Sequence, residues 1–236
     1  MKKLSYILLV LFMVTVFVGC SQSYSYTVLV SSDNEPYSSV DENGEPKGFE
    51  VDILKAAADA EGFDVKVTAD INSDYNCCSS KLTDGSENFD YTTEYCDTAI
   101  VFAVKKNSKI SAYEQILSKT IGVIDGSDGE NFANQIAPQY DITVNKYTDR
   151  TKMYKDVLSG KIIGCFDEEL TLQQAIKDGT KLQTFENSEH SGSLSFAVNK
   201  GKNANFIKSF NKGLQTIIDN GEYKKIAEKY GVKTEN

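Results

Sequence analysis

The sequence is poor in residue types on which many protein functions depend. Its 236 residues include one histidine, His190, one arginine, Arg150, and three prolines. His190 lies in "ENSEHSGS", which we expect to be a polar loop, and has no evident serine or cysteine partner, which disfavours nucleophilic catalysis. No glycine-rich phosphate loop, metal-ligand spacing or paired-carboxylate signature is evident. We therefore expect no enzyme activity, no cofactor and no metal.

Long apolar runs are also scarce, and the one at the N-terminus, from Tyr6 to Val18, is shorter than the about 20 residues of a membrane span. Two lysines precede it and small residues follow, which predicts a secretory signal over residues 1–19. The Gly19-Cys20 junction resembles a bacterial lipoprotein signal, which implies lipidation of Cys20 and a polar tether over 20–25. An ordinary signal peptide with an incidental cysteine is the alternative.

The chain lacks the clustered positive charge that nucleic acids and anionic lipid surfaces require. Removal of residues 1–19 leaves 23 basic and 34 acidic side chains. We therefore expect no nucleic-acid partner, and membrane attachment only through the lipid. The remaining 217 residues are enough for one or two domains with a real core.

Four cysteines remain beyond the anchor, and none belongs to a zinc pattern, because no histidine lies near them. An exported protein permits disulfides, but four cysteines allow three pairings and the sequence dictates none. Free thiols or one disulfide are both open. The cysteines are Cys77, Cys78, Cys96 and Cys165.

Short apolar runs alternate with helical patterns along the chain. This alternation predicts βαβ units with largely parallel sheets, and therefore an α/β fold. The expected strands are 26–32, 64–68, 99–104, 120–124, 141–147, 161–166 and 181–185. The expected helices are 48–63, 111–118, a helix from 129, 149–160, 168–179 and a C-terminal helix.

Two segments, "VFAVKKNSK" (101–109) and "SFAVNKGKN" (195–203), echo each other. Coincidence between two ordinary strands is one explanation. We interpret them instead as strands that carry the chain out of one lobe and back. Lobe 1 would comprise 24–98 and 199–236, and lobe 2 would comprise 102–196. Two such lobes form a hinged cleft that can close on a ligand.

Four stretches resemble the type 2 periplasmic solute-binding proteins, in the branch that serves polar amino-acid ABC importers. They are "EPYSSVDENGEPKGFEVDILKAAADAEGF" (35–63), "KTIGVIDGSDGE" (119–130), "MYKDVLSGKIIGCFDE" (153–168) and "GEYKKIAEKYG" (221–231). The resemblance implies a two-lobe fold with a hinge of two crossover strands and a small-molecule ligand, an amino acid or an amine. It also implies ABC permease and ATPase partners and an extracytoplasmic location. We expect a monomer.

The resemblance implies ligand contacts from both lobes. Tyr37 lies in the loop after the first strand, where α/β sheets place ligands, although it also suits a packing ring. Phe49 suits the core and a cleft wall equally, and the resemblance favours the wall. Asn34, in the same loop as Tyr37, is a further expected contact.

Lobe 2 carries the residues expected to hold the ligand's charged groups. The glycine-bracketed loop 124–131 opens a helix whose free N–H groups attract anions. Ser127 keeps the hydroxyl that the family uses for the ligand carboxylate, whereas Asp128 would repel an anion and could cap the helix. Asp167 ends a strand and is, by resemblance, the partner of the ligand's α-ammonium; it could also be the N-cap of helix 168–178.

The segment from 69 to 88 departs from the family. It shows neither helical nor strand periodicity, so lobe 1 is expected to lack a helix and a strand. Thr83 matches the threonine of the usual Thr-X-X-Arg turn, but the arginine position falls near Ser86. Arg150 is interpreted as a solvated surface charge, which leaves no guanidinium for a ligand carboxylate.

Three hypotheses follow. The first is the binding lipoprotein of an importer, whose ligand has an amine but little or no carboxylate. The second is a degenerate binding protein that acts as a sensor or scaffold. The third, an enzyme, has the least support.

Overall fold

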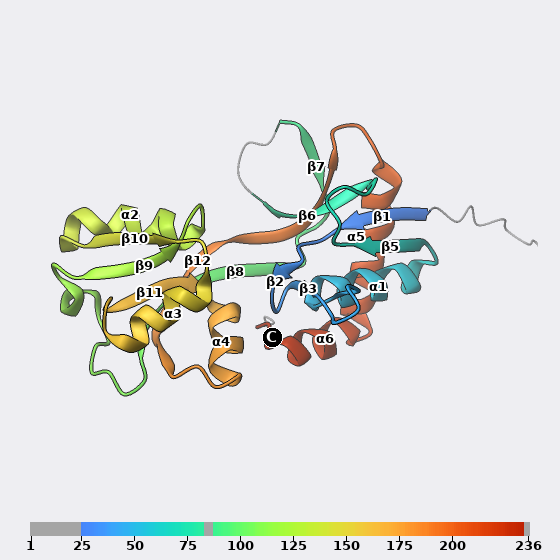
Figure 1. The fold of residues 1–236 in the computed structure, drawn as a ribbon. Helices are drawn as coiled ribbons and strands as arrows, with labels where there is room; N and C mark the ends of the chain where they lie inside the picture. The colour runs from blue at the N-terminus through green and yellow to red at the C-terminus, as the bar shows by residue number, and fades with distance from the viewer. Residues whose placement is uncertain (1–24, 83–86, 234–236) are drawn as a thin grey trace, which may run out of the picture.

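The computed structural model describes residues 25–82 and 87–233. One nine-stranded sheet runs through the molecule in the order β10-β9-β11-β8-β12-β6-β1-β5, with β7 paired to β12. Figure 1 shows two lobes side by side, joined by the long strands β8 and β12. The two-lobe α/β fold predicted from the sequence is therefore confirmed.

Lobe 1 is built on parallel pairing of β1 with β5 and β6, and on helices that pack against one another. A small antiparallel sheet, β2-β3-β4, leads into its first helix. The lobe 1 elements are β1 (Ser25–Leu29), β2 (Asp33–Asn34), β3 (Ser38–Val40), β4 (Pro46–Lys47), α1 (Phe49–Glu61), β5 (Asp64–Thr68), β6 (Cys77–Leu82), β7 (Phe89–Tyr91), α5 (Ala204–Asp219) and α6 (Glu222–Tyr230).

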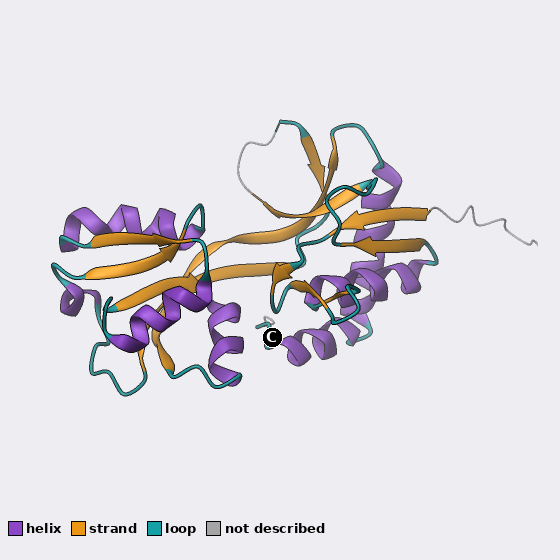
Figure 2. Ribbon diagram, viewed as in Figure 1, coloured by secondary structure: helices purple, strands orange, loops and turns teal. Residues whose placement is uncertain are grey.

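Lobe 2 has helices on both faces of its sheet, as Figure 2 shows. Its apolar side chains form two clusters, one on each face of the sheet. Helices bury both faces, so the strands between them carry apolar side chains on both sides. The lobe 2 elements are η1 (Tyr113–Ile116), β9 (Thr120–Ile124), α2 (Asp128–Tyr140), β10 (Thr143–Tyr147), α3 (Arg150–Ser159), β11 (Gly164–Glu168) and α4 (Glu169–Lys177).

The lobes are linked by β8 (Cys96–Lys105) and β12 (Leu182–Asn199), which pair antiparallel. Core packing puts the change of lobe on β12 between Phe185, in a lobe 2 cluster, and Leu194, in the lobe 1 core. The echoing segments lie on these two strands, but 101–105 pairs within lobe 2 whereas 195–199 pairs within lobe 1. The exact division into lobes stays a prediction.

Two local predictions were wrong. The segment 69–88 was expected to lack a strand. It contains β6, which pairs with β1 and β12 although its own sequence has no strand periodicity. His190 lies within β12, where its backbone is opposite Ala99, and not in a loop.

Contact between α1 and α5 fixes the lobe 1 core, and Gly213 lies where the two helices meet. A Cβ at this position would collide with the carbonyl oxygen of Ala57 on α1. We expect Gly213→Ala to lower the free energy of unfolding by about 1–3 kcal/mol, since overpacking outweighs the better helix propensity of alanine. Urea denaturation measures this loss. Lys208→Ala, at an exposed position of α5, is the control; equal stability of both variants would contradict the packing argument.

Candidate functional site

The candidate site is the edge of lobe 2 where β9, β10 and β11 end. These strands are parallel, so their carboxyl ends share one edge, at which α2, α3 and α4 begin. This edge faces lobe 1. Leu170, in the first turn of α4, is buried in the lobe 1 core, and the Thr171 hydroxyl donates to the carbonyl oxygen of Glu35 at 3.0 Å. Open α/β sheets place ligands at such an edge.

Asp167, the penultimate residue of β11, is a buried and extensively hydrogen-bonded side chain at this edge. It is 3% exposed. Arg150 donates from Nε to both carboxylate oxygens, at 3.2 and 3.0 Å. The Tyr154 hydroxyl donates to Oδ2 at 2.8 Å, and the backbone N–H of Glu168 donates to Oδ1 at 2.9 Å. The carboxylate is therefore held by two residues of α3 and by its own strand end.

This geometry corrects two interpretations. Arg150 is not a solvated surface charge: its side chain is 30% exposed and forms an ion pair with Asp167. Burial alone would lower the pKa of Arg150, but the Asp167 carboxylate outweighs it and raises that pKa. Asp167 is not the N-cap of α4 either, because Glu168 occupies that position. Asp167 is thus not a lone acid: a guanidinium already faces it.

Ser127 and Asp128 lie at the start of α2, beside the end of β11. Ser127 is the N-cap, and its Oγ accepts from the Glu130 N–H at 3.2 Å. Asp128 is the first helical residue, so the alternative in which Asp128 caps the helix is wrong. Gly129 packs against Phe166 so closely that a Cβ would lie 3.1 Å from the Phe166 carbonyl oxygen. The structure thus brings both residues to the same edge as Asp167.

Tyr37 and Phe49 are both buried in the lobe 1 core, at 1% and 0% exposure. The Phe49 ring packs against the rings of Tyr95, Tyr223 and Tyr230. Phe49 is therefore packed in the lobe 1 core, and its role as a cleft wall stays a prediction. Burial raises the pKa of Tyr37, and the Glu168 carboxylate of lobe 2 adds to the rise. Tyr37 thus lies near the lobe interface, and its contact with a ligand stays a prediction.

Of the three remaining expected residues, only Asn34 lies among the described residues. Asn34 is half-buried in β2, in the small sheet that precedes α1. Its contact with a ligand stays a prediction. Thr83, the residue after β6, and Cys20, the expected lipidation site, lie outside the described residues.

Glu50 is a buried acid that the sequence reasoning missed. It lies in the first turn of α1, is 1% exposed, and accepts hydrogen bonds on Oε1 from Ser79 Oγ at 2.6 Å and from the Tyr95 hydroxyl at 2.8 Å. Burial raises its pKa. Its position could have been found, because Ile53 and Leu54, three and four residues later, lie on the same buried face. Glu50 therefore ties α1 to β6 and to the start of β8.

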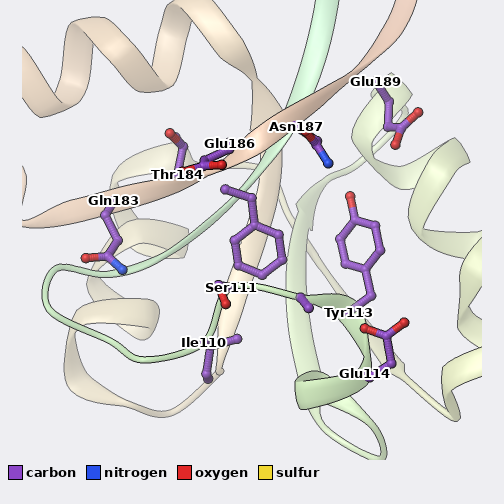
Figure 3. A pocket seen from close by; sticks show the side chains of 11 residues that line it. Ile110, Ser111, Tyr113, Glu114, Gln183, Thr184, Glu186, Asn187 and Glu189 are labelled. Carbon is purple, nitrogen blue, oxygen red and sulfur yellow. The ribbon is translucent and has the colours of Figure 1, made fainter.

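A separate cavity of about 600 Å³ lies in lobe 2 between the η1 region and β12. Figure 3 shows the Tyr113 ring extending toward the strand that carries Asn187 and Glu189. Burial raises the pKa of Tyr113 to about 12, with Glu189 contributing. None of the residues expected in the site lines this cavity. Its lining is Ile110–Glu114, Gln183–Asn187 and Glu189.

The cysteines, the candidate metal ligands and the helices of the described residues were also compared with the expectations from the sequence. Cys77, Cys78, Cys96 and Cys165 are free thiols. Within residues 25–82 and 87–233, no group of three or more histidine, cysteine and acidic side chains is arranged to hold a metal ion. Among the helices of these same ranges, none combines the length and apolar character of a membrane span.

Comparison with curated proteins finds relatives of similar length. The arginine-binding extracellular protein ArtP of Bacillus subtilis is 25% identical over 216 residues, which cover 85% of this chain and 83% of ArtP. A Neisseria gonorrhoeae protein named "Probable histidine-binding protein" is 25% identical over 228 residues, which cover 88% of this chain and 83% of that protein.

Solved structures agree with the two-lobe architecture. Substrate-binding domain 2 of Lactococcus lactis GlnP superposes with a TM-score of 0.76 and 29% identity, covering 91% of this chain and 98% of that domain. The second substrate-binding domain of a "putative amino acid ABC transporter" from Streptococcus pneumoniae superposes with a TM-score of 0.75 and 28% identity, covering 87% of this chain and 99% of that domain. The model of the bacterial extracellular solute-binding proteins, family 3, matches residues 26–77 and 74–233. The chain therefore belongs to family 3 of the bacterial extracellular solute-binding proteins.

Proposed function

We propose that the protein is the extracytoplasmic substrate-binding component of an ABC importer, and that it binds an amino acid or a related small amine between its lobes. The observation that carries this proposal is the Arg150–Asp167 pair at the lobe-facing edge of lobe 2. It supplies fixed, hydrogen-bonded charges where α/β folds receive polar ligands. Two curated relatives are named as an arginine-binding protein and a "Probable histidine-binding protein", and these names support the same ligand class.

The proposal extends to attachment and partners. Cys20 would carry the lipid after cleavage of residues 1–19, and would tie a monomer to the outer side of the cell membrane. A membrane permease and an ATPase would complete the importer. Ligand binding would then shift the population between open and closed lobes.

A degenerate binding protein, acting as a sensor or scaffold, is the second candidate function. It is favoured by the saturation of Asp167, whose carboxylate accepts from Arg150, Tyr154 and Glu168. A ligand ammonium could reach this carboxylate only by displacing one of these donors. Catalysis has less support. An ancestral amino-acid-binding protein, described as a precursor of cyclohexadienyl dehydratase, has the same fold at a TM-score of 0.71, but 21% identity extends only to the fold.

Isothermal titration calorimetry on residues 21–236, run against the common amino acids and polyamines, tests the proposed function. We expect at least one amino acid to bind, and Asp167→Ala to weaken its binding at least tenfold, because Asp167 orients the charged edge of the site. Glu114→Gln removes an exposed charge elsewhere in lobe 2 and should leave the affinity unchanged. Absence of heat and of thermal stabilisation with every compound would reject the importer in favour of the sensor or scaffold.

A further inference from the structure

Arg150 is a positively charged residue that an ion pair holds in a fixed position at the lobe-facing edge. It is the only arginine of the chain. It begins α3, whose N-cap, Asp149, accepts from the Thr151 N–H at 2.8 Å and thereby fixes the first turn. Its side chain is 30% exposed, whereas that of Asp167 is 2% exposed. The guanidinium therefore lies between a buried carboxylate and solvent.

The hydrogen-bonding capacity left at this pair belongs to the arginine. A guanidinium has five N–H donors, and Arg150 uses its Nε donor on Asp167. Among the described residues, no hydrogen bond involves either of its two terminal nitrogens. An ionised carboxylate offers about four acceptor sites. Asp167 fills its sites with Arg150, Tyr154 and Glu168. The pair can thus donate hydrogen bonds to a further anion, but it has no acceptor left for a further cation.

The pair also lies at the edge of lobe 2 that faces lobe 1. β11 continues from Asp167 into α4, where Leu170 packs into the lobe 1 core and Thr171 bonds to Glu35 of lobe 1. The terminal nitrogens of arginine form a planar fork that matches a carboxylate in bidentate geometry. Asp167 and Tyr154 would act as positioning residues, because they hold the guanidinium and do not themselves need to touch the solute.

We propose that the terminal nitrogens of Arg150 bind the carboxylate of the solute. This inference rests on the proposed function and narrows its ligand class to small molecules that carry a carboxylate, such as an α-amino acid. It replaces the expectation of an amine with little or no carboxylate. The carboxylate is then received by lobe 2, and not by the arginine turn that the resemblance leads one to expect in lobe 1.

Pairs of amino acids and their decarboxylated amines test the inference: arginine with agmatine, lysine with cadaverine, and histidine with histamine. Calorimetry on residues 21–236 should show at least one amino acid bound at least 100-fold tighter than its amine. Arg150→Gln should weaken the amino acid at least 100-fold and change the amine less than threefold. Arg150→Lys, a point charge without the fork, should recover part of the loss. Lys155→Gln removes an exposed charge from α3 and is the matched control.

The outcomes separate the two proposals. If the unmodified protein binds no amino acid, the proposed function fails and the inference fails with it. If it binds an amino acid and Arg150→Gln binds the same amino acid within threefold, the binding function stands and the role of Arg150 is rejected. Equal affinity of the unmodified protein for an amino acid and its amine also rejects that role. Circular dichroism and thermal melting of each variant establish that it folds.

Discussion

Asp167→Ala is expected to lower the free energy of unfolding by about 3 kcal/mol, the lower end of the range for breaking a buried ion pair. The substitution leaves Arg150 without its counter-ion and deprives the Tyr154 hydroxyl of its acceptor. The lower end applies because the Arg150 side chain is 30% exposed, so water can solvate part of the freed charge. Urea denaturation at neutral pH measures the loss.

A double-mutant cycle isolates the ion pair. Arg150→Ala should also destabilise the fold, because it leaves the Asp167 carboxylate buried with fewer donors. The double variant should be less destabilised than the sum of the two single variants, since each single change already breaks the same interaction. Glu114→Gln serves as the control for a lost surface charge. A loss below about 1 kcal/mol for Asp167→Ala, within the range of surface pairs, would contradict the pairing.

Glu50→Leu is expected to have the other large effect, a loss of free energy of unfolding of about 2–6 kcal/mol. One buried and one half-buried hydroxyl donor would lose their acceptor, at about 1–3 kcal/mol each. The donors are Ser79 and Tyr95, on β6 and just before β8. Glu50→Gln keeps an oxygen acceptor in the same place and should cost less. Urea denaturation of both variants measures the difference; equal losses would contradict the assigned hydrogen bonds.

The pH dependence of the same residue has a definite sign. Burial raises the folded-state pKa of Glu50 above its ordinary value, so the folded protein keeps this proton to a higher pH than the unfolded chain. The resulting stabilisation is complete below the unfolded pKa and is lost as the pH rises through the folded pKa. Glutamine cannot titrate. The stability of Glu50→Gln relative to the unmodified protein should therefore improve from about pH 4 to about pH 8, by about 1.4 kcal/mol for each unit of pKa shift. A difference that does not change with pH would show that Glu50 is not perturbed by burial.

The regular βα pattern was predictable because it is local. The expected strands 64–68 and 120–124 match β5 and β9 at both ends, and the helix expected over 48–63 contains α1. In each case the apolar period lies within the element itself, and for α1 a glycine lies directly beside each end.

The strand β6 and the Arg150–Asp167 pair could not be predicted, because both form through contacts with residues distant in sequence. β6, with the sequence "CCSSKL", has no apolar alternation, and pairing with β1 and β12 makes it a strand. Arg150 and Asp167 are separated by 17 residues, and only the parallel packing of β10, β9 and β11 brings α3 beside the end of β11. Sequence reasoning therefore found the acid and misjudged its counter-ion.

Nitrogen-15 NMR of the arginine side chain tests the central claim most directly, because a chain with one arginine gives one Nε–Hε signal. In the free protein we expect this signal to be protected from solvent exchange by the Asp167 carboxylate, and Asp167→Asn to remove the protection. Saturation with the tightest-binding amino acid should shift the signal and make the terminal N–H protons resolvable, since a bound carboxylate restricts their rotation. A freely exchanging signal that the ligand leaves unchanged would contradict both the ion pair and the site built on it.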